Sequence, residues 1–202
     1  MLACPRSTCQ CKAASICHGT RSLSATEDNL IGVSSYPSAA TERDDAIHSL
    51  ESGQAALEVL YARLSDAQME QSATMAGGSW SAKDLVGHVA AWEELALQTI
   101  GAWRTGQPLP TDGEWPGTDA FNARVQERTC GQLLLDVRQH AAATHGALVR
   151  AIQSLTGEEW RSSRGDNTLG DTLGRITGGP AGTFRHVFDH LDDLKAFVDS
   201  MH

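Results

Sequence analysis

The sequence predicts an all-α fold, a four-helix bundle whose helices are joined by long crossover connections. Apolar residues recur at helical spacing in four separate stretches, and no stretch of convincing length alternates between apolar and polar residues as a β-strand would. The segments between the four stretches are too long for tight turns, which favours crossovers. With 202 residues, the chain can bury a core without disulfides or a structural metal.

The first helix is predicted over residues 43–64, after an N-terminal tail. Residues 1–42 are rich in Ser, Thr, Ala and Cys and lack apolar periodicity, so we expect a disordered or non-native extension there. Four of the five cysteines lie in this tail, at a spacing that matches no zinc or redox motif. The folded domain is therefore expected over residues 43–202. Its first apolar stripe consists of Ile47, Leu50, Leu57, Leu60 and Leu64.

The second helix is predicted over residues 82–105. It follows a connector in which a short helical turn is expected at 66–71. Ser81 is suited to be the N-cap and Asp84 follows three residues later, which is a capping-box pattern. Gly106 then marks the end of the helix. Its apolar stripe consists of Leu85, Val89, Trp92, Ala96, Ile100 and Trp103.

The third and fourth long helices are predicted over residues 132–155 and 181–200. A Pro- and Gly-rich loop and a short helical segment at 119–127 come before the third helix. Residues 156–179 contain six glycines and little periodicity, so we expect a long irregular connection there. Pro180 suits the first turn of the last helix, because its missing N–H would be unpaired at that position anyway.

The charge balance argues against nucleic acid as a partner. The chain has 16 Lys and Arg against 25 Asp and Glu, a formal net charge of −9, and no window shows a basic cluster. Its apolar stretches are too short to span a membrane, and its first residues lack the apolar run of a signal peptide. We therefore expect a cytoplasmic protein that does not associate with membranes.

Three histidines are the main candidates for chemistry. His88 lies on the buried stripe of the second helix, and His186 and His190 lie four residues apart on the last helix, so their side chains share one face. Two such imidazoles can reach one cation, and a third from a facing helix would complete a triad with an open fourth position. From the spacing alone, the alternatives are a metal triad and satisfied core histidines. His140 and His145 point in different directions, which favours solvent or the helix margin.

The residues around His88 resemble a family signature. The segment Trp80-Ser-Ala-Lys-Asp-Leu-Val-Gly-His88-Val-Ala-Ala-Trp92-Glu93 is similar to the W-S-x-K-D-x-x-x-H-x-x-x-W-E pattern of DinB-like four-helix proteins. Two further segments resemble the ClbS/DfsB branch of that group. They are Trp115-Pro-Gly-Thr-Asp-Ala-Phe121-Asn122 followed by Arg124, and Thr183-Phe-Arg-His186-Val-Phe-Asp-His190. The resemblance covers about residues 43–200 and implies the DinB-like fold.

The resemblance also implies a metal site. In many DinB-like proteins one histidine of the second helix and two of the last helix bind a divalent ion, usually nickel or zinc. The matching positions here are His88, His186 and His190. The ClbS/DfsB branch differs, because metal dependence is not a general expectation there and a Tyr often follows the first histidine of the last helix. This chain has Val187 at that place, so a step that depends on a phenol would be lost.

Further candidates lie beside these histidines. Glu93 and Asp193 belong to an acidic face that is expected to be mostly solvated, although either carboxylate could orient a ligand histidine through a hydrogen bond. We expect Trp80, Trp92 and Trp103 to be core residues first and the wall of a substrate pocket second. The candidates for lining a pocket or orienting a ligand histidine are therefore Trp92, Glu93 and Asp193.

Three functions are compatible with these observations. The favoured one is a metal-dependent enzyme, a hydrolase or thiol transferase, in which a divalent ion activates water or holds a low-molecular-weight thiol for attack on a small electrophilic molecule. The second is a metal-independent self-resistance protein of the ClbS/DfsB type, which hydrolyses or sequesters a DNA-damaging metabolite. The third is a non-catalytic ligand-binding or stress protein. The expected partner is a small molecule, and a homodimer is compatible with each function.

Overall fold

A computed structural model describes residues 39–75, 78–176 and 182–201. The predicted tail lies mostly at residues 1–38, outside this part of the chain. The first helix, α1, spans Ala39–Tyr61, so it includes residues that the sequence analysis assigned to the tail, and it ends three residues before the predicted end at 64.

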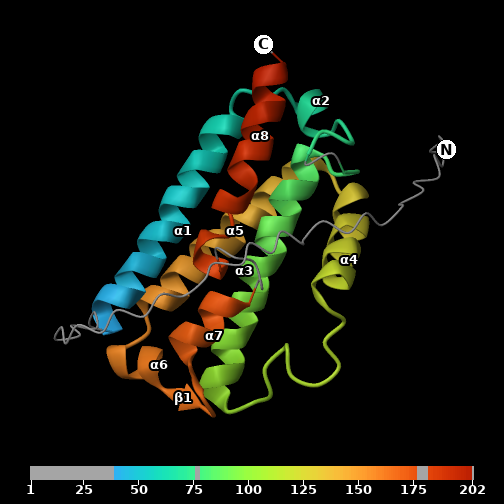
Figure 1. The fold of residues 1–202 in the computed structure, drawn as a ribbon. Coiled ribbons are helices and arrows are strands. Elements are labelled where there is room, and N and C mark those ends of the chain that lie inside the picture. Colours follow the sequence, from blue (N-terminus) through green and yellow to red (C-terminus); the bar gives the residue numbers. More distant parts are fainter. Residues whose placement is uncertain (1–38, 76–77, 177–181, 202) are drawn as a thin grey trace, which may run out of the picture. The chain divides into compact units, whose positions relative to one another are not determined.

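Four helices make up the bundle, and further elements occupy the connections between them (Figure 1). The bundle helices are α1, α3 (Ala82–Thr105), α5 (Leu134–Gln153) and α8 (Phe188–Ser200). The connections contain α2 (Asp66–Met69), α4 (Thr118–Cys130), α6 (Gly157–Arg161), α7 (Leu169–Arg175), the 3-10 turn η1 (Thr183–Arg185), and a hairpin of β1 (Ser163–Arg164) and β2 (Asn167–Thr168). The predicted all-α bundle with long crossover connections is confirmed.

Two clusters of core residues define the directions of the helices. The first cluster joins the end of α1 to the beginnings of α3 and α5, through residues such as Tyr61, Leu85 and Leu134. The second joins the beginning of α1 to the ends of α3 and α5, through residues such as Leu50, Ile100 and Ile152. Therefore α3 and α5 are parallel, and α1 is antiparallel to both. Parallel neighbours require a crossover that returns the chain to its starting end, and the connection containing α4 makes this return.

The central helix, α3, has the predicted bounds. Its capping box is present, because the Ser81 Oγ accepts a hydrogen bond from the Asp84 N–H at 3.1 Å and the Asp84 Oδ2 accepts one from the Ser81 N–H at 2.9 Å. Gly106 ends the helix with a φ of 71°, in the left-handed region. Within the helix, Gly87 lies against Thr129 of α4, where a Cβ would contact the Thr129 Oγ1 and come within 2.7 Å of its Cγ2.

The expectation of an irregular connection at 156–179 is wrong, because this segment contains α6, the hairpin and α7. Both helices begin with a capping box, one formed by Thr156 and Glu159 and the other by Thr168 and Asp171. They are also anchored by packing, since Trp160, Leu169 and Leu173 are buried in the second core cluster. Two of the glycines have identifiable roles. Gly170 allows close packing, because a Cβ there would lie 2.6 Å from the Trp160 ring, and Gly165 allows the turn of the hairpin, where its φ is 60°.

The last helix begins later than predicted. Its regular part, α8, starts at Phe188 instead of 181 and is preceded by η1. Gly182 explains the late start, because its φ of 68° is outside the helical region and a Cβ there would come 2.5 Å from the Gly174 carbonyl oxygen. Pro180, expected in the first turn, lies outside the described residues.

The remaining helices depart from prediction only at their ends. The segment expected at 119–127 is α4, and the helix expected at 132–155 is α5. The short turn expected at 66–71 is α2. Within the described residues, none of the helices combines the length and apolar character needed to cross a bilayer.

Candidate metal centre

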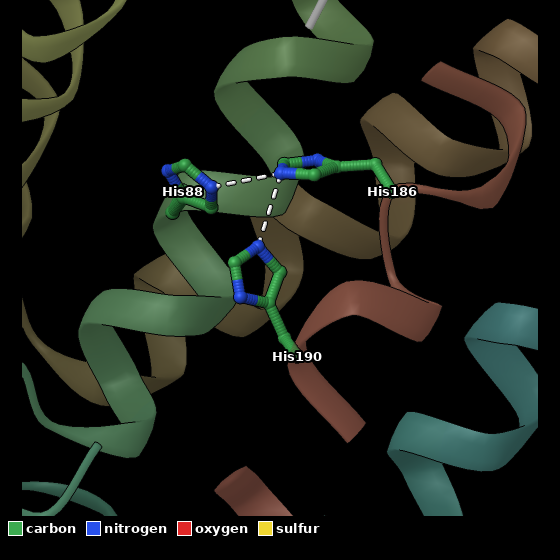
Figure 2. Close-up of side chains that lie close together, drawn as sticks. All are labelled: His88, His186 and His190. Atoms are coloured by element: carbon green, nitrogen blue, oxygen red, sulfur yellow. Dashed lines mark hydrogen bonds between the residues drawn. The ribbon is translucent and has the colours of Figure 1, made fainter. Parts of the chain in front are cut away.

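Three histidines from two distant parts of the chain point their ring nitrogens at one another (Figure 2). His88 comes from α3, His186 directly follows η1, and His190 lies in the first turn of α8. The Nε2 atom of His186 lies 3.0 Å from that of His88 and 3.0 Å from that of His190. The nitrogens offered by the three rings all lie within 4.8 Å of one another. The structure therefore brings together the three histidines that the sequence analysis selected.

Local backbone geometry explains how the last two histidines come together. His186 and Val187 precede the regular part of α8, yet both have helical backbone angles, with φ of −54° and −55°. The four-residue spacing therefore still places His186 and His190 one turn apart on the same face. Gly53 of α1 lets this segment approach closely, because a Cβ there would lie 3.1 Å from the Val187 Cβ.

Burial keeps the three imidazoles uncharged. His88 is 3% exposed and His186 is 9% exposed, while His190 is half-buried. Burial is the largest cause that lowers the pKa of each ring, and it takes the pKa of His186 to about 3. The neighbouring histidines lower the pKa of His88 further, whereas Asp189 and Asp193 act in the opposite direction on His190. Neutral rings offer lone pairs to a metal ion at pH 7.

The three rings alone cannot satisfy their own hydrogen bonding. A neutral ring nitrogen offers one hydrogen or one lone pair, so the Nε2 atom of His186 cannot bond well to both neighbours at once. The Nδ1 atom of His88 is buried and has no hydrogen-bond partner within the described part of the chain. Imidazole nitrogens around one tetrahedral ion at about 2.0–2.1 Å would lie about 3.3 Å apart, close to the two 3.0 Å separations seen here. The donor set fits a divalent ion.

Comparison with known families places this geometry in context. A family model described as the DinB superfamily matches residues 39–193, well over half of the chain. The chain belongs to the DinB superfamily. Neither the curated proteins nor the solved structures gave a match. DinB-superfamily proteins are often metal-binding, and the His88, His186 and His190 group could hold an ion.

Trp80 and Trp92 border the histidines of this DinB-superfamily protein. The Trp80 ring lies edge-on to His88, with 4.7 Å between the ring centroids. The centroid of Trp92 is 6.3 Å from that of His88 and 6.2 Å from that of His186. Trp92 is 1% exposed, so it belongs to the core as expected while also flanking the site. Trp103 lies in the second core cluster and donates its indole N–H to the Ser162 Oγ at 2.7 Å.

Side chains from α4 and the loop before it extend this aromatic group outward. The Phe121 ring centroid is 4.6 Å from that of Trp92, and Trp115 is 6.3 Å from Trp92 and 5.4 Å from Phe121. Asn122 accepts a hydrogen bond from the Trp92 indole N–H at 3.1 Å. Phe121, Trp115 and Asn122 are only half-buried, so they form the outer part of the wall. Helical periodicity did not identify them, and the signal was the resemblance of residues 115–124 to a family segment.

The two acidic candidates have different surroundings. Asp193 is exposed on α8 and acts on His190 through its charge. Glu93 is 5% exposed, and its Oε1 lies 2.8 Å from the Nδ1 atom of His145, a histidine outside the triad. Burial lowers the pKa of His145, but the hydrogen bond and charge of Glu93, with smaller contributions from the charges of Glu51 and Glu58, raise it overall. His145 is therefore a half-buried partner of Glu93, while His140 is exposed as expected.

Proposed function

We propose that the protein is a metal-dependent enzyme that acts on small electrophilic molecules, with His88, His186 and His190 holding a divalent nickel or zinc ion. The observation that carries the proposal is the convergence of three ring nitrogens that cannot satisfy one another. Family membership supports it, because metal binding is frequent in the DinB superfamily. The fold by itself does not identify the function, because proteins that share one fold catalyse many different reactions.

The proposed chemistry is hydrolysis or thiol transfer. A divalent ion held by three imidazoles supplies Lewis acidity, which activates water or a low-molecular-weight thiol as a nucleophile at neutral pH. The three neutral rings contribute no negative charge, so the site as a whole would favour an anionic nucleophile. The buried Trp92 would exclude water on one side, and the half-buried Phe121 packed against it would offer an apolar surface to the substrate. A homodimer is compatible with this proposal.

A second candidate is metal-independent self-resistance of the ClbS/DfsB type. It is favoured by the position of Trp115, Phe121 and Asn122, which resemble a segment of that branch and lie against Trp92 beside the histidines. Val187 counts against it, because this residue replaces the Tyr common in that branch and is 6% exposed in the first core cluster. A non-catalytic ligand-binding or stress function would use the same aromatic wall.

Metal analysis separates these proposals. The full-length protein would be stripped with a chelator, then titrated with nickel or zinc while its melting temperature and metal content are measured. At a hundredfold excess over the dissociation constant, binding should add about 2.7 kcal/mol to the free energy of unfolding. Replacing any one of His88, His186 and His190 with Ala should sharply reduce metal content.

His140→Ala is the matched control, because His140 is exposed and lies outside the triad. It should bind metal like the wild type. Hydrolysis of an activated ester and transfer of a thiol to an aromatic halide, each assayed with and without metal, would then identify the reaction class. If neither nickel nor zinc changes the melting temperature of the wild-type protein, the proposal of a metal-dependent enzyme is refuted and the second candidate is favoured.

A further inference from the structure

A cavity of about 200 Å³ lies between α1, α3 and α5. Its lining residues are spaced by three, four or seven positions on each helix, so one face of each helix turns toward it. The lining includes Leu57, Glu58 and Tyr61 from α1, Val86 and Glu93 from α3, and Arg138 from α5. His88 lies about 160° around α3 from Val86, so this cavity and the histidine group occupy different sides of the helix.

The buried end of the cavity contains an unpaired polar group. Tyr61 is 6% exposed, and its hydroxyl is buried with no hydrogen-bond partner within the described residues. Burial raises the pKa of Tyr61, with Glu58 acting in the same direction and Arg138 against it, so both charges lie near the phenol. A buried hydroxyl without a partner is destabilising, so the Tyr61 hydroxyl needs a partner such as an ordered water or a bound ligand.

Among the described residues, Glu58 is the carboxylate of the lining that forms no ion pair, although its charge also acts on His145. The His145 ring lies 2.8 Å from Glu93, and the Arg138 guanidinium lies 3.5 Å from the Asp66 carboxylate. Glu58 instead accepts a hydrogen bond at 2.7 Å from the neutral amide of Gln54. Glu58 is exposed and Tyr61 is buried, so the cavity runs from a negative group at the surface to a hydroxyl inside.

The rest of the lining is apolar. Leu57, Val86, Val89 and Ala90 are all buried and contribute aliphatic surface, and Ala141 and Ala142 complete the wall on α5. An aliphatic chain in contact with these side chains would be removed from water, which stabilises the complex in proportion to the area buried. The cavity thus combines aliphatic walls with an acidic group and a free hydroxyl.

We propose that this cavity binds a small organic ammonium ion that carries a short alkyl chain. The ammonium would donate hydrogen bonds to the Glu58 carboxylate and to the Tyr61 phenol oxygen, and the alkyl chain would pack against Leu57 and Val86. This site is independent of the histidine group and of the function proposed for it.

Calorimetric titration of the full-length protein with three probes of equal chain length tests the proposal. The probes are n-butylammonium, n-butanol and n-butyrate, which differ in charge at one end. We expect n-butylammonium to bind in the millimolar range and at least tenfold more tightly than the other two. Equal binding of n-butanol, preferred binding of n-butyrate, or no binding of n-butylammonium would each overturn the proposal.

Substitutions then locate the bound cation. Tyr61→Phe removes only the hydroxyl and should weaken n-butylammonium binding about fivefold to tenfold, while the melting temperature of the ligand-free protein is maintained or raised. Glu58→Gln should weaken binding at least tenfold. Glu158→Gln makes the same change in net charge at an exposed position on α6 and should leave binding unchanged. Unchanged binding in Tyr61→Phe or Glu58→Gln, or an equal loss in Glu158→Gln, would refute the assignment.

A last variant separates this site from the histidine group, because an amine can also coordinate a metal ion. His88→Ala in the presence of a chelator should bind n-butylammonium like the wild type. Loss of binding in this variant would assign the amine to the histidine group and overturn the proposal. Failure of the proposed metal-dependent function would leave the expected result here unchanged.

Discussion

Replacing Trp92 with Ala gives a direct measure of how firmly the aromatic wall is packed beside the histidines. Trp92 is 1% exposed, and its ring centroid lies 6.3 Å from that of His88, 6.2 Å from that of His186 and 4.6 Å from that of Phe121. Its indole N–H donates to the Asn122 Oδ1. The substitution therefore removes core volume, one aromatic pair and one hydrogen bond together.

The expected loss follows from these contacts. Truncation of a fully buried large aromatic side chain costs about 3–5 kcal/mol, which includes the cavity left behind. Within that sum, the pair with Phe121 at 4.6 Å contributes about 0.5–1.5 kcal/mol and the hydrogen bond to Asn122 about 1 kcal/mol. Asn122 is half-buried and can turn toward solvent, so it adds no large desolvation penalty. We expect about 4 kcal/mol in total.

Urea unfolding of the chelated protein, followed by far-UV circular dichroism, measures this loss without a contribution from metal. For a domain of this size, about 4 kcal/mol corresponds to a fall of about 8–16 °C in melting temperature. Asn122→Ala removes only the hydrogen bond and should cost about 1 kcal/mol or less. A loss below about 1 kcal/mol in Trp92→Ala would refute the packing argument and make Trp92 the wall of an open pocket.

Two further predictions concern α3 and its neighbours. His145→Ala should lower the free energy of unfolding more at about pH 5.5 than at about pH 9. Glu93 raises the pKa of His145 in the native state. The stability that the pair contributes is therefore complete below the unfolded-state pKa of about 6.5, and it is lost as the pH rises through the native pKa. Equal losses in urea unfolding at the two pH values would contradict this prediction. Gly87→Ala should lower the free energy of unfolding by about 1–3 kcal/mol, because the added Cβ would clash with Thr129 of α4. Gly101→Ala on the same helix is the control, because nothing lies within 4 Å of its Cβ, and it should raise the free energy of unfolding by up to about 1 kcal/mol. Similar melting temperatures for these two variants would show that α4 yields easily to the added methyl group.

Local rules account for the parts of the fold and site that the sequence predicted well. The bounds of α3 follow from the Ser81 and Asp84 capping box and from Gly106, all within a few residues of the ends they define. The grouping of His186 with His190 follows from their four-residue spacing, and His88 follows from its place on a buried stripe. Each of these inferences depends on residues close together in the sequence, within or at the ends of one helix.

Some missed features depend on contacts between helices. Others, the helices α6 and α7, were missed because the glycines of residues 156–179 were taken to indicate an irregular segment. Glu93 was expected on a mostly solvated face, with orientation of a ligand histidine as the alternative, but it is buried and meets His145 of α5. Periodicity within α3 carries no information about this neighbouring helix. Tyr61 was left out of the predicted stripe of α1, although it lies four residues after Leu57 and periodicity alone could have included it. The helices α6 and α7 could have been found, since Thr156 with Glu159 and Thr168 with Asp171 are capping boxes in the sequence.

The separation of His88 from His186 along the chain has a consequence for the order of unfolding. The two residues are 98 positions apart, so an ion shared between them would close a long loop that the unfolded chain leaves open. Closing a loop of that length removes about 4–5 kcal/mol of chain entropy from the unfolded state. The amide hydrogens of α8 would then exchange with solvent slowly as long as the ion stays bound, because this helix could not detach from α3. Release of the ion and detachment of the C-terminal helix would become a single step.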